Sequence, residues 1–340
     1  MKAVRFDHYG EPADVLTVTE QPVPEPGPGE VRLKIKFSPV NPSDLLYVRG
    51  HYSGVAEHFP SGAGFESASV IDALGPGVEG LSVGQRVFAH NGPGGNWSEY
   101  AVVPAQTAWP VPDDIPDEQV ASLMINPATA ILMVRHVLAV PRGQWLLQSA
   151  AGSELGRMII RLAKHDGIRT VNVVRRHEAV QEQELKDLGA DEVIVSSDGP
   201  IDEQVRRIVG PRGVDFALDP VAGETGSQIF RSLSEDGRML LYGSLTGEGV
   251  SVGDDPRLTL SGRRTLEVYW LGYWLPRLHK SGFFPPGRPA IQQLIDEIAD
   301  LIRAGVLETS PGKRFGLDQI HAAVAEAESV GRSGKVLIAP

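Results

Sequence analysis

The sequence predicts an α/β protein built from two different parts, and three observations point to that fold class. Residues 1–120 contain short alternating or apolar runs between Pro- and Gly-rich turns, which is typical of a β-barrel or rolled sheet. From about residue 120, strand-length apolar runs alternate with helical periodicities, which implies a parallel, doubly wound sheet. The stretch Gln144–Arg176 has the pattern strand, turn, helix and strand, and predicts the first βαβ unit of that sheet.

The β-rich part begins directly as an alternating strand at Met1–Phe6. Further strands are expected at Val31–Phe37, Ala68–Ala73, Arg86–Ala89 and Tyr100–Val103. The turns between them are expected at Pro22–Gly29, Gly75–Gly77 and Gly92–Gly95, because proline and glycine interrupt regular structure.

The second part opens with a helical pattern over Glu118–Leu138 that is interrupted near Pro127. After the central unit, the expected helices are Glu178–Leu188, Asp202–Val209, Thr225–Leu233, Ile291–Ala304 and Ile320–Ala327. The expected strands are Glu192–Val195, Val214–Leu218, Arg238–Tyr242, Thr265–Trp270 and Gly334–Ile338. Ligands of such a sheet bind at the carboxyl ends of the strands, near Ser149–Ser153, Arg175–His177, Asp219–Val221 and Tyr242–Leu245.

The turn of the central unit is the expected phosphate site. Ser149–Ser153 is a run of small residues, and an apolar helical period follows from Leu155 until Gly167 ends it. Unpaired N–H groups and the dipole at a helix N-terminus favour a pyrophosphate. The fingerprint G-x-G-x-x-G becomes Ala151-Gly152-Ser153-Glu154-Leu155-Gly156, so only the last glycine is in place and Glu154 adds a carboxylate. The loop alone therefore leaves open a βαβ unit that binds no nucleotide.

The end of the second strand strengthens the nucleotide interpretation. An NAD site usually carries an acidic residue there, whereas this chain has Arg175, Arg176 and His177. A guanidinium suits a 2′-phosphate, so the expected cofactor is NADP(H). The alternative is a solvated basic strand end.

Composition limits the function classes. The chain has 340 residues, enough for two domains with their own cores. Its net charge of −11 argues against a nucleic-acid or anionic-membrane partner. No apolar run has membrane-spanning length or the character of a signal peptide, so a cytoplasmic protein is expected. The lack of cysteine excludes disulfides and thiolate zinc ligands.

The order of a β-rich part, a dinucleotide-binding part and a terminal return resembles the medium-chain dehydrogenase/reductase superfamily over essentially the whole chain. The resemblance is carried by PGPGEV (Pro26–Val31), NPSD (Asn41–Asp44), GAGFE (Gly62–Glu66), VGQRV (Val83–Val87), the nucleotide loop and SGKVLI (Ser333–Ile338). It implies a GroES-like barrel as catalytic domain, residues 1–120 with 275–340, and a Rossmann-type NADP(H)-binding domain, residues 121–274.

The superfamily contains zinc alcohol dehydrogenases and zinc-independent reductases, and this chain resembles the second group. The zinc branch takes a cysteine from the segment occupied here by Asn41–Asp44, and a histidine from Gly-His-Glu. This chain has Gly64-Phe65-Glu66 in place of the second motif. Without the thiolate and the imidazole, a tetrahedral zinc site has no obvious ligand set, and no metal is expected.

Within the zinc-independent branch the chain is most similar to the 2-enoyl thioester reductases, followed by the quinone oxidoreductases. The catalytic tyrosine of the former, which follows Asn-Pro-Ser-Asp, matches Tyr52, and Asn126 of INPATA (Ile125–Ala130) matches an asparagine near the reacting end. The cofactor contacts expected from the pattern and the resemblance are Asn126, Gly152, Ser153, Glu154, Leu155, Arg175, Arg176, His177, Tyr242, Gly243, Ser244, Leu245, Tyr269, Trp270, Leu271 and Lys335.

Several positions depart from the family pattern. Glu154 stands in place of a glycine of the phosphate loop, and Gly152 in place of an asparagine. Arg176 and His177 replace the last two residues of Arg-Asp-Arg, whereas the first arginine is kept as Arg175. The positive character is preserved, so the expectation of NADP(H) remains.

The expected reaction is NADPH-dependent reduction of an activated C=C bond. Hydride would reach the β-carbon, hydrogen-bond donors would hold the developing enolate, and a proton would reach the α-carbon. Tyr52 is the expected proton donor, directly or through water, and Asn126 would fix the nicotinamide or the carbonyl. The alternative for Tyr52 is a loop tyrosine that only packs at the rim of the site.

Two other functions stay open: an NADPH:quinone oxidoreductase, and a non-catalytic NADPH-binding protein, which Glu154 keeps possible. The substrate is expected to be an enone, an enoyl thioester or a quinone. The resemblance implies a homodimer, formed through an edge strand at Thr265–Trp270, since such edges tend to pair. The aromatic run Trp270–Trp274 serves packing or lines an apolar pocket, and Asp44 and Asp219 are expected to brace turns.

Overall fold

The computed structural model describes residues 1–52, 58–91, 95–253, 258, 261–329 and 334–340. Residues 92–94 of a predicted turn, and Ser333 of the C-terminal pattern, lie outside these ranges. The chain forms two compact units. The first unit comprises Met1–Ile125, Leu294–Arg303 and Glu308–Pro340, and the second comprises Asn126–Gln293 and Ala304–Leu307. Residues 275–293 therefore group with the second unit, whereas the functional division into domains stays a prediction.

The first unit is built from mostly antiparallel strands. A small sheet has the order β2-β1-β4, from β1 (Lys2–Phe6), β2 (Thr17–Glu20) and β4 (Ser61–Gly62). A larger sheet has the order β15-β16-β3-β5-β6-β8, with β7 also paired to β3. Its strands are β3 (Glu30–Pro39), β5 (Glu66–Leu74), β6 (Arg86–His90), β7 (Tyr100–Pro104), β8 (Ala108–Pro110), β15 (Pro311–Phe315) and β16 (Lys335–Ile338).

Short helices accompany these sheets. They are α1 (Pro12–Val15), α2 (Pro42–Val48), α3 (Asp117–Ala121) and α12 (Ile320–Glu328). The sequence pattern did not predict α2, although its start is well marked: Asn41 caps it, Pro42 follows and Asp44 completes a capping box. Tyr47, Val48 and Ile320 share one buried core with residues of β1 and β16.

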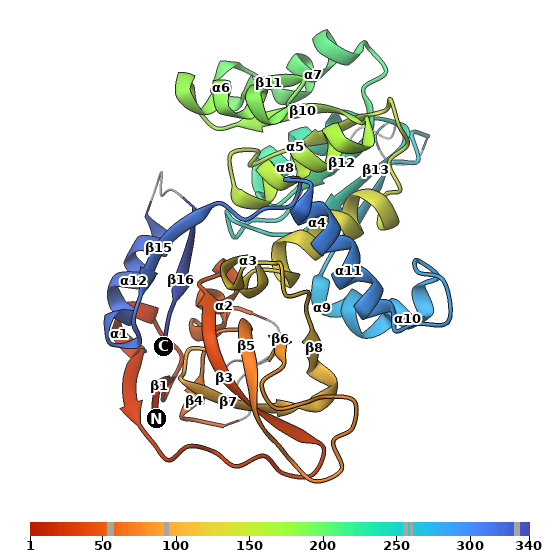
Figure 1. Cartoon of the computed structure of the whole chain (residues 1–340). Coiled ribbons are helices and arrows are strands. Elements are labelled where there is room, and N and C mark those ends of the chain that lie inside the picture. Colours follow the sequence, from red (N-terminus) through yellow and green to blue (C-terminus); the bar gives the residue numbers. More distant parts are fainter. Residues whose placement is uncertain (53–57, 92–94, 254–257, 259–260, 330–333) are drawn as a thin grey trace. The chain divides into compact units, whose positions relative to one another are not determined.

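The second unit contains a parallel sheet of the predicted Rossmann type (Figure 1). Its order in the described chain is β11-β10-β9-β12-β13-β14. The strands are β9 (Trp145–Gln148), β10 (Arg169–Val174), β11 (Glu192–Val195), β12 (Val214–Asp219), β13 (Leu233–Leu241) and β14 (Thr265–Val268). From β9 the chain first adds β10 and β11 on one side of that strand, and then adds β12, β13 and β14 on its other side. The direction in which strands are added therefore reverses between β9 and β12. Ligands of open α/β sheets bind at this reversal point.

Helices cover the sheet in two groups. The helices of this unit are α4 (Thr129–Ile131), α5 (Glu154–Asp166), α6 (Ala179–Leu188), α7 (Ile201–Val209), α8 (Gly223–Arg231), α9 (Leu271–Trp274) and α10 (Leu278–Ser281). Ile160 of α5 and Leu185 of α6 share one buried cluster, whereas Val205 of α7 and Phe230 of α8 belong to another. Burial of two separate clusters against one sheet is the doubly wound arrangement predicted from the alternating pattern.

Most predicted elements are confirmed within a few residues, and two differ. β13 begins at Leu233 rather than Arg238, because Leu233 pairs with Val214 before a register shift. The strand-like run at Thr265–Trp270 ends at Val268, and its aromatic continuation forms α9. The long helical pattern around Pro127 is divided into α3, the π-helix η2 (Met124–Ala128), α4 and the π-helix η3 (Leu132–Val137). A final helix, α11 (Ala290–Arg303), has residues in both units.

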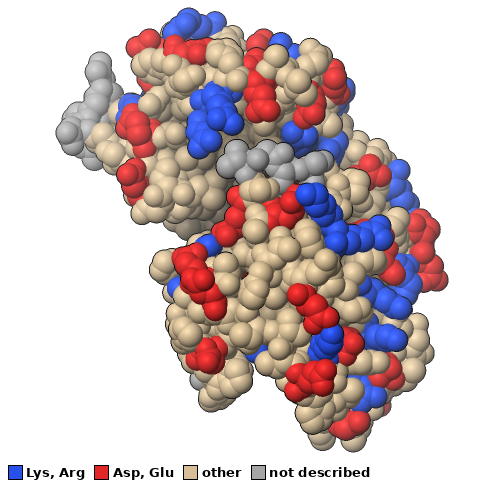
Figure 2. Space-filling view, turned by 90° about the vertical axis from the view of Figure 1, so that its left-hand side faces the viewer, with Lys and Arg blue, Asp and Glu red and all other residues tan. Residues whose placement is uncertain are grey.

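On the face shown in Figure 2, acidic and basic side chains are interspersed over the surface. Among the described residues, no helix is both long and apolar enough to cross a bilayer.

Candidate active site

The predicted phosphate loop lies between β9 and α5. Ser153 caps α5, and its hydroxyl accepts a hydrogen bond from the Gly156 N–H at 3.1 Å. Ala150 has a φ of 50°, which gives the tight turn a left-handed residue without glycine. Glu154 occupies the first helical turn, where a carboxylate is favourable for the helix dipole but unfavourable for a neighbouring phosphate. The thirteen-residue helix α5 therefore directs its N-terminal N–H groups at the expected site.

Gly156 is required by close packing. A Cβ at this position would lie 2.6 Å from the carbonyl oxygen of Ala151 and 2.7 Å from that of Ala150. Both neighbours are backbone atoms, so neither can rotate away. The one glycine retained from the dinucleotide fingerprint is thus the glycine that lets the helix approach the turn.

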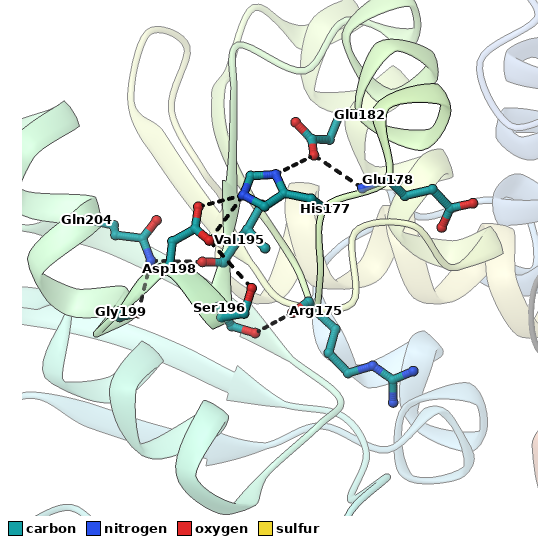
Figure 3. Close-up of polar contacts among 10 residues, drawn as sticks. Arg175, His177, Glu178, Glu182, Val195, Ser196, Asp198, Gly199 and Gln204 are labelled. Carbon is teal, nitrogen blue, oxygen red and sulfur yellow. Dashed lines mark hydrogen bonds and ion pairs between the residues drawn. The ribbon is translucent and has the colours of Figure 1, made fainter.

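Arg175, Arg176 and His177 follow β10 and are exposed. His177 is held on both sides of its ring, with Nδ1 3.0 Å from Glu182 Oε1 and Nε2 2.8 Å from Asp198 Oδ2. The hydrogen bonds that Glu182 and then Asp198 accept from the ring raise the pKa of His177. The carbonyl of Arg175 accepts the Ser196 hydroxyl at 3.2 Å, while its guanidinium points away from this cluster (Figure 3). Arg175 is consequently better presented to an anion than His177, whose ring nitrogens already face carboxylates.

The reversal point of the sheet carries a bonded pair, Ser149 after β9 and Asp219 at the end of β12. The Ser149 hydroxyl donates to the Asp219 carboxylate, which also accepts the N–H groups of Val221 at 3.2 Å and Ala222 at 2.8 Å. Burial raises the pKa of Asp219. The predicted bracing role of Asp219 is confirmed by these contacts.

The segment after β13 lies against the end of β12. The Tyr242 N–H donates to the Asp219 carbonyl at 2.9 Å, and the Leu245 N–H donates to the Pro220 carbonyl at 3.0 Å. A Cβ on Gly243 would lie 2.8 Å from that Pro220 oxygen, so this close approach needs glycine. The Tyr242 hydroxyl is buried without a hydrogen-bond partner among the described residues, and its pKa is raised by burial.

The three predicted residues after β14 differ in exposure. Tyr269 is buried, and desolvation raises the pKa of its hydroxyl. Trp270 is 42% exposed and Leu271 begins α9. Val268, the last residue of β14, is 70% exposed on a strand that ends the sheet order.

Tyr52 belongs to the first unit and comes directly before residues 53–57, which the structure does not describe. The half-buried Tyr52 ring packs against Phe65, with 5.5 Å between the ring centroids. Phe65 also contacts Tyr47 at 5.4 Å. The residue that replaces the zinc-ligating histidine of the family is therefore part of an aromatic core.

The position that ligates zinc in the other branch of the family carries Phe65 in this chain. Phe65 offers no lone pair, and the sequence contains no cysteine. Among the described residues, no group of three or more His, Asp or Glu side chains could hold a metal ion.

A buried polar network lies beside Phe65, and the sequence pattern did not predict it. Asn41, Asp44, Glu66 and Lys335 are each at most 4% exposed. Asp44 accepts the N–H groups of Asn41 at 2.7 Å and Phe65 at 2.9 Å, which confirms its predicted bracing role. Burial raises the pKa of Asp44 to about 6 and that of Glu66 to about 7. The capping-box spacing from Asn41 to Asp44 was the available signal, whereas Glu66 appeared in the sequence only as part of the family motif Gly62–Glu66 and not as a member of a polar network.

The predicted site residues thus fall into two sets. Those of the phosphate loop and of the segments after β10, β13 and β14 follow parallel strands, whose carboxyl ends share one edge of the sheet. Tyr52 and Lys335 lie in the first unit, and Asn126 is the first residue of the second, inside η2.

Two family models match the chain. A model described as an alcohol dehydrogenase GroES-like domain matches residues 27–113, and one described as a zinc-binding dehydrogenase matches residues 188–338.

Known relatives match nearly the whole chain. The chain is 31% identical to the human mitochondrial enoyl-[acyl-carrier-protein] reductase over 92% of its own length and 81% of the relative. A quinone oxidoreductase from Pseudomonas syringae pv. Tomato has a TM-score of 0.86 and 25% identity, over 100% of this chain and 99% of the other. A mycobacterial protein solved in complex with NADPH has a TM-score of 0.84 and 27% identity, over 100% of both chains.

Proposed function

Since the chain belongs to the zinc-independent branch of the medium-chain dehydrogenase/reductase superfamily, we propose that it is an NADPH-dependent reductase of an activated C=C bond, with enoyl thioesters as its substrate class. The observation that carries the proposal is the 31% identity to an enoyl-[acyl-carrier-protein] reductase over 92% of the chain. Tyr52 and Asn126 stand at positions that the resemblance to such enzymes marks as catalytic.

The second unit is the proposed cofactor domain, and the first the proposed catalytic domain. The N–H groups at the start of α5 would hold the pyrophosphate, and the Arg175 guanidinium would bind the 2′-phosphate. His177 would contribute its charge, because its two carboxylate partners favour the imidazolium form. Bound NADPH would supply the hydride, while the chain orients the nicotinamide through Asn126 and the residues after β13 and β14.

Tyr52 is the proposed proton donor to the α-carbon. A phenol ordinarily titrates near pH 10, so its hydroxyl carries a proton at neutral pH. Its ring packs against Phe65, with 5.5 Å between the ring centroids, and this contact restricts the ring. Because the Tyr52 side chain is already restricted by this packing, less of its conformational entropy has to be lost when the proton is transferred.

A quinone oxidoreductase is the second candidate function. It is favoured by the fold similarity to the Pseudomonas syringae quinone oxidoreductase, with a TM-score of 0.86. A quinone is also a conjugated carbonyl compound, but its reduction can end on oxygen and needs no proton on carbon. The two functions therefore differ in whether Tyr52 is required.

The test is oxidation of NADPH, followed by its absorbance, with trans-2-enoyl-CoA, simple enones and benzoquinone as separate substrates and NADH as the control cofactor. Turnover of enoyl-CoA with a clear NADPH preference is expected. Turnover of quinones alone would replace the proposal by the second candidate. NADPH binding without turnover of any substrate would favour a non-catalytic binding protein.

We also propose a homodimer that forms through β14, the last strand of the sheet order, where Val268 and Trp270 are exposed. A cytoplasmic location stays a proposal, and the human relative is by its name a mitochondrial enzyme.

A further inference from the structure

The segment Arg175–His177, which follows β10, is bound on one side by the turn after β11 (Figure 3). The Ser196 hydroxyl donates to the Arg175 carbonyl at 3.2 Å, and His177 Nε2 lies 2.8 Å from Asp198 Oδ2. Ser196 and Asp198 are the first and last residues of the 3₁₀ turn η4 (Ser196–Asp198). Two side chains of one short turn therefore hold both ends of the segment.

Helix α7 fixes this turn. The Gln204 amide donates to the two carbonyls that flank η4, to that of Val195 at 2.9 Å and to that of Gly199 at 3.0 Å. Because one side-chain amide joins both ends of the turn, Ser196 and Asp198 are placed by α7 as well as by β11.

Helix α6 binds the segment on its other side. Glu182 Oε1 lies 3.0 Å from His177 Nδ1 and accepts the Glu178 N–H at 3.4 Å. Glu178 precedes α6 and makes no cap hydrogen bond with its own side chain, so the Glu182 carboxylate serves the N–H group at this helix start. The His177 ring is thus held between α6 and η4 at both of its nitrogens.

This arrangement needs the protonated ring. A neutral imidazole has one N–H group and one lone pair, so it can donate to only one of the two carboxylates and turns its lone pair toward the other. The imidazolium donates to both, and these contacts raise the pKa of His177. The charged side chains of α6, of η4 and of the segment that adjoin the ring are Glu182, Asp198, Arg175, Arg176 and Glu178. Carboxylates and guanidinium groups ordinarily titrate far outside about pH 7–9, so among these groups His177 is the one that changes charge there.

We propose that Glu182 and Asp198 are positioning residues for cofactor discrimination: with the His177 imidazolium held between them, the segment presents the Arg175 guanidinium to the 2′-phosphate, and the preference for NADPH falls as His177 loses its proton. The proposal rests on the proposed function only for the place of the 2′-phosphate. Exposed ion pairs contribute little energy each, so the effect is the orientation of one segment and should be a few-fold change in affinity. If the two carboxylates instead repelled the phosphate, their removal would have the opposite sign.

The first readout is the dissociation constant of NADPH and of NADH, from fluorescence titration at neutral pH. Asp198→Asn and Glu182→Gln should each weaken NADPH binding about 3- to 5-fold and change NADH binding less than about 2-fold. Asp187→Asn is the matched control, because Asp187 is an exposed carboxylate of α6 that accepts a hydrogen bond from Gln183 and does not contact His177. It removes the same charge and should leave both dissociation constants unchanged.

The second readout is the pH profile of the ratio between the two dissociation constants. A phosphate monoester is fully ionised well above its second pKa of about 6, so the wild-type preference for NADPH should fall about 3- to 5-fold from about pH 7 to pH 9. His177→Gln should show the weak preference at every pH, whereas His177→Arg, which stays charged, should keep the strong one. By linkage, NADPH but not NADH should raise the pKa of His177 in an NMR titration of its ring protons.

The proposal is overturned if Asp198→Asn and Glu182→Gln strengthen NADPH binding, because the carboxylates would then compete with the phosphate, or if they leave it unchanged. It is equally overturned if the wild-type preference is constant over this pH range, or if His177→Gln keeps the wild-type pH dependence. Both readouts are taken without substrate. A chain that binds NADPH but reduces no enoyl thioester would therefore contradict the proposed function and leave this result standing.

Discussion

Tyr52 keeps its ring against Phe65, so its hydroxyl can be removed without loss of that packing. Tyr52→Phe should lower kcat for enoyl-CoA reduction by about 10²–10⁴-fold, the usual contribution of a positioned proton donor. Quinone reduction, if present, should be nearly unchanged and serves as the internal control. The measurement is steady-state kinetics with both substrates. Unchanged enoyl-CoA turnover would reduce Tyr52 to a packing residue.

Arg175 presents its guanidinium away from the His177 cluster, which predicts that it dominates recognition of the 2′-phosphate. Arg175→Gln should weaken NADPH binding by about 10- to 100-fold, since a charge-assisted hydrogen bond to phosphate is lost, and should leave NADH binding unchanged. His177→Gln should have a smaller effect, because Glu182 and Asp198 already occupy the ring nitrogens. Fluorescence titration of both cofactors measures the difference. Equal losses for NADPH and NADH would contradict a role in phosphate recognition.

At the scale of the elements, the junction of the phosphate loop and α5 depends on Gly156. Gly156→Ala would place a methyl group within 2.6–2.7 Å of two carbonyl oxygens, so the helix start must shift. We expect a loss of about 1–3 kcal/mol in the free energy of unfolding and weaker NADPH binding. Chemical denaturation checks the first effect and titration the second. Ala163→Gly is the control, because Ala163 lies in the same helix but away from the loop. It should lower the free energy of unfolding and leave the affinity for NADPH unchanged.

The type of an element could be predicted where an apolar period extends over several turns of helix, or where glycine or proline marks the end of the element. The apolar period from Leu155 and the terminal Gly167 predicted α5 almost to the residue. Seven-residue α2 was missed because it offers too few turns for a period to show, and only its capping residues marked it. The aromatic run after Val268 gave no periodicity that separates a strand from the four-residue α9. Local pattern thus fails where an element is shorter than two turns.

At the scale of the whole molecule, the fold followed from the order of its parts, whereas the buried network did not. The strand-end residues of the cofactor site could be predicted, because parallel strands bring their carboxyl ends to one edge. Glu66, Asn41 and Lys335 come from distant segments of the chain, and no local pattern shows that they meet. The resemblance gave Lys335 a cofactor role that stays a prediction, and the structure shows in addition that this lysine is buried.

Buried carboxylates also make global stability depend on pH. Burial raises the pKa of Asp44 to about 6 and of Glu66 to about 7, whereas both titrate near pH 4 when unfolded. The folded state binds these protons more tightly, so their contribution to stability is present below about pH 4 and is lost as the pH rises through 6 to 7. The melting temperature should fall between about pH 4 and pH 7, and Glu66→Gln should flatten that fall. If the melting temperature of the wild type rises over this range while that of Glu66→Gln does not, the raised pKa assigned to Glu66 would be contradicted.

The central claim is that hydride reaches one carbon of the double bond and a proton the other. The most direct measurement is product analysis by NMR after reduction of a trans-2-enoyl-CoA with NADPH deuterated at the transferred position, and separately with ordinary NADPH in D₂O. The account predicts deuterium from the cofactor at the β-carbon and deuterium from solvent at the α-carbon, with the second process slowed in Tyr52→Phe. A saturated product without cofactor deuterium at the β-carbon, or no saturated product while quinones are reduced, would contradict it.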